Sequence, residues 1–144
     1  MEHLPADQWT EENIRNLVIN STQYGSSYGV LTDFVVLQNK TMISGDGWVP
    51  EEGYDPTQKA YYQNAMSTDL YVSTPYVDTT TQEFIITISM PIKKDGVVSG
   101  VVARDMHITE IQKIIDQYQS DNGSYLYLID NMGHILSHQN TAFE

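Results

Sequence analysis

The chain is 144 residues long, the length of a single domain, and a fold of this size buries roughly 70% of the surface that its unfolded chain exposes. Its 7 basic and 19 acidic residues give a net charge of -12, which argues against a nucleic-acid partner because such partners need basic patches. The absence of cysteine excludes a disulfide framework and a thiolate metal site, and no segment reaches the ~20 apolar residues of a membrane span.

The first predicted element is a short amphipathic helix that begins after Thr10. Thr10 is a favourable N-cap, acidic residues fill the first turn, and Ile14, Leu17 and Val18 recur at helical spacing. The next segment, residues 30–43, predicts a β-hairpin whose two strands are separated by an Asn-Lys turn. A helix followed by a hairpin therefore opens the fold.

A long polar loop, residues 45–55, interrupts this regular pattern. Loops of this length inside a compact domain are usually functional. Its acidic side chains lack the alternating spacing of a calcium loop, which favours a solvated loop; they are Asp46, Glu51, Glu52 and Asp55. Asp55 and Pro56 then predict the start of a helix that continues through TQKAYYQNA, because Asp caps helices and Pro is favoured in their first turn.

The remaining segments predict a mainly antiparallel sheet with one more helix. DLYVSTPYVD is rich in β-formers, and EFIITISMPI and VVSGVVARDM predict two long strands joined at an Asp-Gly turn. Thr109 is expected to cap the helix EIQKIIDQYQ, and SYLYLID and GHILSHQ predict a last pair of strands. Helices beside a mainly antiparallel sheet define the α+β class.

Five stretches in chain order carry a resemblance to a known family. They are YDPTQKAYYQNA, STPYVD, ITISMPI, DGVVSGVVARDM and YLIDNMGHILSH. Together they resemble the Cache family, and specifically the membrane-distal module of a double-Cache sensor domain. The resemblance implies a PAS-like antiparallel sheet flanked by helices. It also implies a location outside the bacterial cytoplasmic membrane, as the input portion of a chemoreceptor or a sensor histidine kinase.

The same resemblance implies how the chain is organised. Residues 1–29 are expected to form an N-terminal helix and connector, residues 30–138 a single PAS-like Cache module, and residues 139–144 the start of a linker to a second module. The sequence starts and stops abruptly, which favours a soluble piece of a longer, membrane-anchored parent protein. Whether that parent is a dimer is left open by the sequence. We expect a sensor and not an enzyme, with no cofactor, since no nucleophile elbow, phosphate loop or metalloprotease motif occurs.

In family members that bind amino acids, a recurring set of polar and aromatic residues forms the ligand site. In this sequence the set falls on Tyr54, Lys59, Tyr61, Tyr62, Tyr76, Asp78, Thr79 and Asp105. Lys59 stands where the family most often has Arg, and Tyr61 where it most often has Trp. A small polar ligand, with an amino acid favoured, is therefore the expected partner.

The chemistry of an amino acid gives these residues their expected roles. Lys59 would hold the carboxylate as a point charge, and the tyrosines would donate phenolic hydrogen bonds beside apolar ring walls. Asp105 and Asp78 would neutralise the ammonium group, with the Tyr76 hydroxyl closing the site. A charge that is buried without a partner costs several kcal/mol, so such a site rejects molecules that lack either group.

Each assignment has a plainer alternative. The tyrosines could pack a helix face onto the sheet, Lys59 could be a solvated surface lysine, and Asp105 could begin the next helix. Asp78 and Thr79 lie in a sequence typical of a turn. The alternative function is a PAS-like module without its own ligand, serving dimerisation or contact with a periplasmic binding protein. In that case Lys59 and Asp105 would be exposed or paired with each other.

Overall fold

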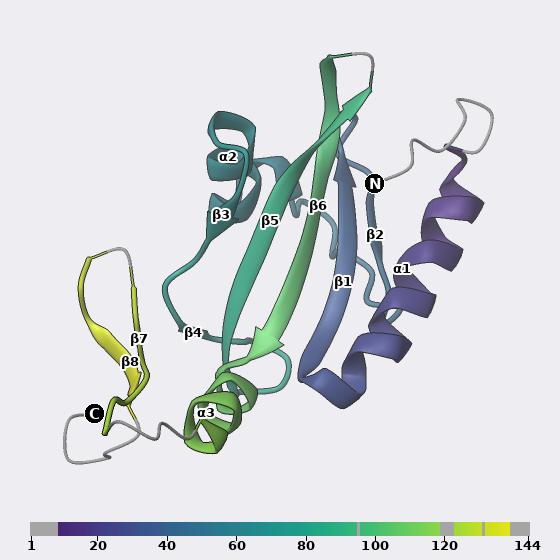
Figure 1. Cartoon of the computed structure of the whole chain (residues 1–144). Helices are drawn as coiled ribbons and strands as arrows, with labels where there is room; N and C mark the ends of the chain where they lie inside the picture. Colours follow the sequence, from purple (N-terminus) through teal and green to yellow (C-terminus); the bar gives the residue numbers. More distant parts are fainter. Residues whose placement is uncertain (1–8, 95, 119–122, 131, 139–144) are drawn as a thin grey trace.

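The computed structural model describes residues 9–94, 96–118, 123–130 and 132–138. Within them, six strands form one antiparallel sheet in the order β2-β1-β6-β5-β3, with β4 also paired to β5 (Figure 1). The strands are β1 (Val30–Leu37), β2 (Met42–Ser44), β3 (Tyr71–Val72), β4 (Tyr76–Val77), β5 (Phe84–Lys94) and β6 (Val97–His107). Three helices accompany the sheet, so the α+β prediction with a PAS-like antiparallel sheet is confirmed.

One face of the sheet is covered by α1 (Glu11–Gly25). As predicted, Thr10 caps this helix by accepting a hydrogen bond from the backbone N–H of Asn13 at 3.2 Å. Ile14 and Val18 of α1 pack against Val35 and Ile43 of the sheet. The helix continues five residues beyond its predicted amphipathic stretch, because Thr22 in its last turns is bonded to the sheet: its Oγ1 accepts from the backbone N–H of Asp33 at 2.8 Å.

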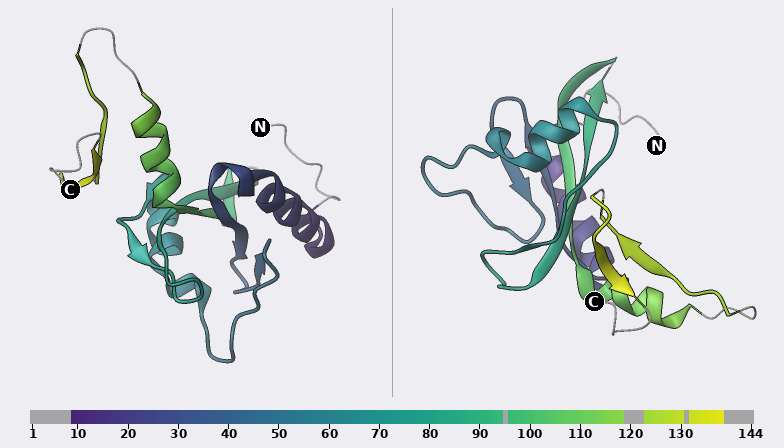
Figure 2. Two further views of the ribbon diagram at one scale, coloured as in Figure 1. Left: turned by 90° about the horizontal axis from the view of Figure 1, so that it is seen from below. Right: turned by 90° about the vertical axis from the view of Figure 1, so that its left-hand side faces the viewer.

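The opposite face is covered by α2 (Ala60–Ser67) and by the long loop that precedes it (Figure 2). Successive residues of a strand point to opposite faces. Val35 of β1 therefore packs under α1, while its neighbours Phe34 and Val36 join the core under α2. Tyr62 and Ala65 are the buried residues of α2 in that second core. The sheet thus separates two apolar layers, one for each helix.

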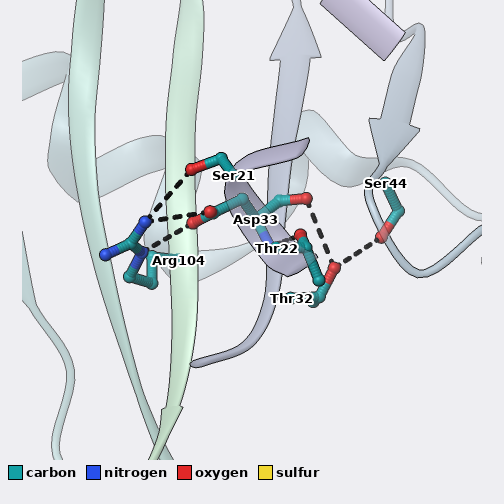
Figure 3. Close-up of polar contacts among 6 residues, drawn as sticks. All are labelled: Ser21, Thr22, Thr32, Asp33, Ser44 and Arg104. Carbon is teal, nitrogen blue, oxygen red and sulfur yellow. Dashed lines mark hydrogen bonds and ion pairs between the residues drawn. The ribbon is translucent and has the colours of Figure 1, made fainter. Parts of the chain in front are cut away.

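A partly buried ion pair joins β1 to β6, and its arginine also bonds to α1 (Figure 3). Asp33 of β1 is 7% exposed and accepts two hydrogen bonds from the Arg104 guanidinium of β6, at 2.7 and 2.9 Å. Arg104 also donates to Ser21 Oγ of α1 at 3.2 Å. Close by, a Cβ added to Gly45 would lie 2.4 Å from the Val18 carbonyl oxygen of α1, so only glycine allows this approach.

The helix predicted from Pro56 onward is wrong in one respect. Asp55 does cap a turn, but the turn is a 3-10 helix, η3 (Pro56–Gln58), and Lys59 after it is extended, with ψ at 151°. The α-helix begins only at Ala60. Lys59 is therefore an exposed, extended residue between the two helical segments.

The β5–β6 hairpin agrees with its prediction, whereas the helix after it starts differently. α3 (Ile108–Gln117) has His107 at its N-cap, without a side-chain hydrogen bond, and Thr109 lies inside its first turn. The predicted Thr109 cap is therefore wrong. The backbone N–H of His107 instead donates to the carbonyl of Gly29 at 2.9 Å, which fixes the end of β6 beside β1 and sets where the helix can begin.

The last two strands, β7 (Tyr127–Ile129) and β8 (Ile135–His138), pair with each other in a separate two-stranded sheet. This hairpin lies beyond α3, away from the six-stranded sheet (Figures 1 and 2). The division into residues 1–29, 30–138 and 139–144 stays a prediction, and residues 139–144 lie outside the described residues. No helix of the described part of the chain is long and apolar enough to cross a membrane.

Candidate functional site

A pocket of about 380 Å³ opens on the α2 face of the sheet, within the range of roughly 300–1,000 Å³ typical of small-molecule sites. It lies between the sheet, the long loop before α2 and the turn after β4. Its lining residues are Leu31, Thr32, Phe34, Met42, Ser44, Asp46, Trp48, Tyr54, Lys59, Tyr76, Val77, Asp78, Thr79, Thr80, Thr81 and Asp105. Six of the eight predicted ligand residues are among them.

The floor of the pocket contains Thr32 and Asp105, and the buried Thr87 lies beside Asp105 on the next strand without lining the cavity. Thr32 of β1, Asp105 of β6 and Thr87 of β5 are direct neighbours in register. Thr87 Oγ1 donates to Asp105 Oδ1 at 2.6 Å, and the Tyr76 hydroxyl lies 2.7 Å from the same Thr87 oxygen. These contacts fix the position of the Asp105 carboxylate in the middle of the floor.

Asp105 is held in an environment that disfavours its charge. Burial raises the pKa of its carboxyl group from the ordinary 3.8 to about 6, and the nearby carboxylates of Asp78 and Asp46 add to the increase, while the bond from Thr87 opposes it. Burial beside Asp105 also raises the pKa of the Tyr76 hydroxyl, to about 12. A cation placed over the floor would relieve this destabilisation.

A cation and an aromatic wall stand on the other side of the pocket. The Lys59 ammonium lies 4.5 Å from the centre of the Tyr54 ring, a cation–π arrangement. The Tyr54 and Trp48 rings pack in a T-shaped arrangement, with their centroids 5.3 Å apart. The ion pairs formed within the described residues include neither Lys59 nor Asp105. Both charges are therefore available to a ligand.

The two remaining predicted residues lie behind the pocket lining. Tyr61 is half-buried; its hydroxyl lies 3.4 Å from that of Tyr54, and its ring packs edge-on against Phe34. Burial raises the pKa of its hydroxyl well above the ordinary range. Tyr62 is 6% exposed and belongs to the core under α2. The structure thus places Tyr61 where it supports Tyr54, and it gives Tyr62 the packing role that was the alternative for the tyrosines.

Asp78 and Thr79 form part of a turn, as their sequence suggested, and the same turn lines the pocket. Asp78 Oδ2 accepts hydrogen bonds from the backbone N–H groups of Thr80 and Thr81, at 3.0 and 2.6 Å, and from the Thr81 hydroxyl at 2.9 Å. The turn and ligand interpretations of Asp78 are compatible. All three bonds end on Oδ2, and they hold the carboxylate in place while Oδ1 makes none of these bonds.

The sequence interpretation missed one charged residue of the site. Asp46 was expected in a solvated loop, but it lines the pocket just after β2. Ser44 Oγ donates to Asp46 Oδ1 at 2.5 Å, and the backbone N–H of Trp48 donates to the same oxygen at 2.9 Å. The composition of the loop could not reveal that Asp46 faces the pocket, because the two hydrogen bonds from Ser44 and Trp48 set its position.

Within the described residues, no three His, Asp or Glu side chains are grouped so as to hold a metal ion.

The comparisons with known proteins agree with this fold. Residues 11–113 match the family described as "Methyl-accepting chemotaxis protein-like, first PDC sensor domain". The chain therefore belongs to this family of sensor domains, and the Cache resemblance is confirmed. It is 29% identical over 133 residues to the methyl-accepting chemotaxis protein McpB of Bacillus subtilis, and 34% identical over 89 residues to McpC of the same bacterium. The matches cover 90% and 60% of this chain but only 20% and 14% of those relatives.

Two solved ligand-binding domains illustrate the structural similarity. The sensory domain of the Campylobacter jejuni chemoreceptor Tlp3, with isoleucine bound, matches with a TM-score of 0.71 and 28% identity, over 97% of this chain and 58% of that one. The ligand-binding domain of the Pseudomonas aeruginosa amino-acid chemoreceptor PctC, in complex with GABA, matches with a TM-score of 0.69 and 29% identity, over 95% and 61%. The chain thus has the fold of chemoreceptor ligand-binding domains.

Proposed function

We propose that this chain is the extracytoplasmic ligand-sensing part of a bacterial transmembrane chemoreceptor, and that its pocket binds a small molecule carrying both a carboxylate and an ammonium group. An α-amino acid is the favoured class. The ligand is bound and released unchanged, so the module acts as a sensor and not as an enzyme. The longer parent protein supplies the membrane anchor and the output domain.

A single observation carries the proposal: Lys59 and Asp105 face one cavity without pairing with each other. A cation and an anion that are held apart over a cavity match the two charges of a zwitterion. Lys59 would receive the carboxylate, and Asp105, helped by Asp78, would receive the ammonium group. The charge-assisted hydrogen bonds so formed are roughly twice as strong as neutral ones.

The ligands of the similar structures support the same class. Isoleucine and GABA each carry one carboxylate and one amino group, and both are bound by domains of this fold that are more than 25% identical to the chain. In isoleucine the two groups share a carbon, whereas in GABA they are separated by a short chain. The two ligands therefore share a carboxylate and an amino group, and they differ in the distance between these groups.

Binding can send a signal only if the ligand prefers one arrangement of the domain over another. The strands β1 and β6 offer a route, because the residues beside Thr32 and Asp105 are Asp33 and Arg104, which hold α1 on the opposite face. A ligand that draws Asp105 and the long loop together would change the forces on these strands. We propose that α1 responds to this change.

The proposal is tested by a thermal-shift screen of the chain against amino acids, small amines and small carboxylates. A ligand at about 100 times its Kd adds ~2.7 kcal/mol to the free energy of unfolding, so a true ligand gives a clear shift. We expect amino acids to shift the midpoint and simple carboxylates or amines to do so weakly. A folded sample that responds to none of these compounds would contradict the proposal and favour a module without its own ligand.

A further inference from the structure

Asp46 gives the pocket a carboxylate that a simple amino acid does not use. The zwitterion of the proposed function is satisfied by Lys59 at one end and by Asp105 and Asp78 at the other. Asp46 enters from the opposite edge of the sheet, beyond β2, whereas Asp78 follows β4. Both hydrogen bonds that the described residues make to Asp46 end on Oδ1, which leaves Oδ2 for another partner.

The charges of the lining are unbalanced. Three carboxylates face the cavity, those of Asp46, Asp78 and Asp105, against the one ammonium of Lys59 in the same lining. A ligand with a neutral side chain adds one positive and one negative charge and leaves the excess unchanged. A ligand with one further positive charge reduces it. Burial is the main cause of the raised pKa of Asp105, and the carboxylates of Asp78 and Asp46 add to it.

The arrangement across the sheet separates two anionic positions. Asp105 is on β6 and β1 lies between β6 and β2, so β6 and the end of β2 are two strand spacings apart, roughly 10 Å. An extended aliphatic side chain that ends in an ammonium or guanidinium group fits between two carboxylates at about this separation. Met42 and Phe34 also line the pocket and provide apolar surface for the methylene groups of such a chain.

The surroundings of Asp46 suit an organic cation. Trp48, whose backbone N–H fixes Asp46, lines the same part of the pocket and meets the Tyr54 ring at 5.3 Å. Aromatic rings attract ammonium and guanidinium groups, Trp most strongly. The Ser44 hydroxyl donates to Asp46 Oδ1 at 2.5 Å and helps to fix the position of this carboxylate. A carboxylate beside an indole is a favourable place for the end of a basic side chain.

We propose that Asp46 and Trp48 form a second subsite, which binds a cationic group on the side chain of the ligand, so that the pocket prefers amino acids with basic side chains. This inference rests on the proposed function, because Lys59 and Asp105 still hold the two groups at the α-carbon. Asp46 is then a determinant of specificity and not merely the residue that closes a turn after β2.

Isothermal titration with matched ligand pairs tests the subsite. Lysine is compared with norleucine, and arginine with citrulline, because each pair has a similar length and differs in side-chain charge. We expect the wild-type chain to bind the charged member at least about tenfold more tightly, the size of one cation–π or ionic contact. In Asp46→Asn this preference should fall to about twofold or less.

A matched control comes from the same loop. Glu51 is exposed and does not line the pocket, so Glu51→Gln removes the same charge from the loop while leaving the subsite intact. We expect Glu51→Gln to keep the full preference for lysine over norleucine. Thermal unfolding of both variants without ligand verifies that each is folded.

The outcomes separate the two proposals. If lysine and norleucine bind the wild type equally, the subsite is wrong while amino-acid binding stands. A preference that survives unchanged in Asp46→Asn would likewise overturn the role of Asp46. If no amino acid binds, the proposed function fails and the subsite fails with it. A preference that is lost in Asp46→Asn and kept in Glu51→Gln supports the second subsite.

Discussion

Arg104 and Asp105 are consecutive residues of β6 whose charges lie on opposite faces of the sheet. The Arg104 guanidinium bonds to Asp33 under α1, and the Asp105 carboxylate accepts from Thr87 in the floor of the pocket. The alternation of a β-strand requires this division. One short stretch of backbone therefore carries both the anchor of α1 and the centre of the candidate ligand site.

The ion pair between Arg104 and the buried Asp33 carboxylate should stabilise the fold. Arg104→Met leaves the 7% exposed Asp33 carboxylate without its cation, and loss of one partner of such a pair typically costs about 3–5 kcal/mol; partial exposure of Arg104 reduces the expected loss to about 2–3 kcal/mol. Chemical denaturation measures the change. Lys93→Met, which breaks an exposed pair with Asp69, should cost much less, because water screens the attraction between exposed charges. An equal decrease in the free energy of unfolding in the two variants would show that the Arg104–Asp33 pair stabilises the fold no more than an exposed pair does.

Removal of the pocket cation should weaken the binding of carboxylate ligands. Lys59→Met deletes a charge-assisted contact of about 2–3 kcal/mol, which corresponds to a roughly 30- to 150-fold increase in Kd. The loss should be smaller for the carboxamide of the same amino acid, which has no negative charge. Titration calorimetry of both ligands gives the comparison, and Lys113→Met on α3, outside the pocket lining, serves as the control. An equal loss for acid and amide would argue against a carboxylate at Lys59.

Binding should depend on pH through Asp105. Its pKa is about 6 in the free protein, and an ammonium group over it favours the ionised form, so a proton is released when the ligand binds the protonated protein. Affinity should fall up to about tenfold per pH unit as the pH drops below about 6 and level off above it. The other charged groups of the pocket are Asp46, Asp78 and Lys59.

Calorimetry between pH 5 and 8 measures this dependence. The control is His107→Gln, which removes an ionisable side chain that pairs with Glu83 at 2.7 Å outside the pocket lining. The slope should survive this replacement. A slope that disappears with His107, or an affinity that is constant across the range, would exclude Asp105 as the titrating group.

Asp105 should also lower the stability of the ligand-free protein at neutral pH. Because burial raises its pKa above the ordinary 3.8, the folded state binds more protons than the unfolded state between about pH 4 and 6, and the free energy of unfolding falls as the pH rises through that window. Asp105→Asn should therefore be more stable than the wild type at pH 7.5, by on the order of 1–2 kcal/mol. Denaturation at pH 4 and 7.5 checks this, and the difference should vanish at the lower pH. A variant less stable than the wild type at pH 7.5 would mean that Asp105 is a structural residue.

Much of the fold could be predicted because its signals are local. The β5–β6 hairpin follows from an Asp-Gly turn between two runs of β-branched residues, and the start of α1 follows from the Thr10 cap. The start of α3 could not be predicted in this way. It depends on the bond between His107 and Gly29, which are far apart in the sequence.

The site was predictable to the extent that it follows a family pattern. The match to the family pattern selected Lys59, Tyr76 and Asp105, and all three line one pocket. Their part in ligand binding stays a proposal. Tyr62 illustrates the limit, because neighbouring residues of a helix face different directions and the sequence does not say which of the two tyrosines meets the core. Asp46 was missed because its place depends on bonds to Ser44 and Trp48.

The contact between Thr87 and Asp105 also decides which way the Tyr76 hydroxyl points its hydrogen. A threonine hydroxyl has one hydrogen, and Thr87 gives it to the Asp105 carboxylate. The 2.7 Å contact with Tyr76 must then use the hydrogen of Tyr76, which leaves only lone pairs for the cavity. While Asp105 is ionised, Tyr76 can accept from a ligand ammonium but cannot donate to a carboxylate. A protonated Asp105 can donate to Thr87, so that the Thr87 and Tyr76 hydroxyl hydrogens both reverse and Tyr76 can donate into the cavity. One proton on Asp105 therefore changes which ligand groups the Tyr76 hydroxyl can bind.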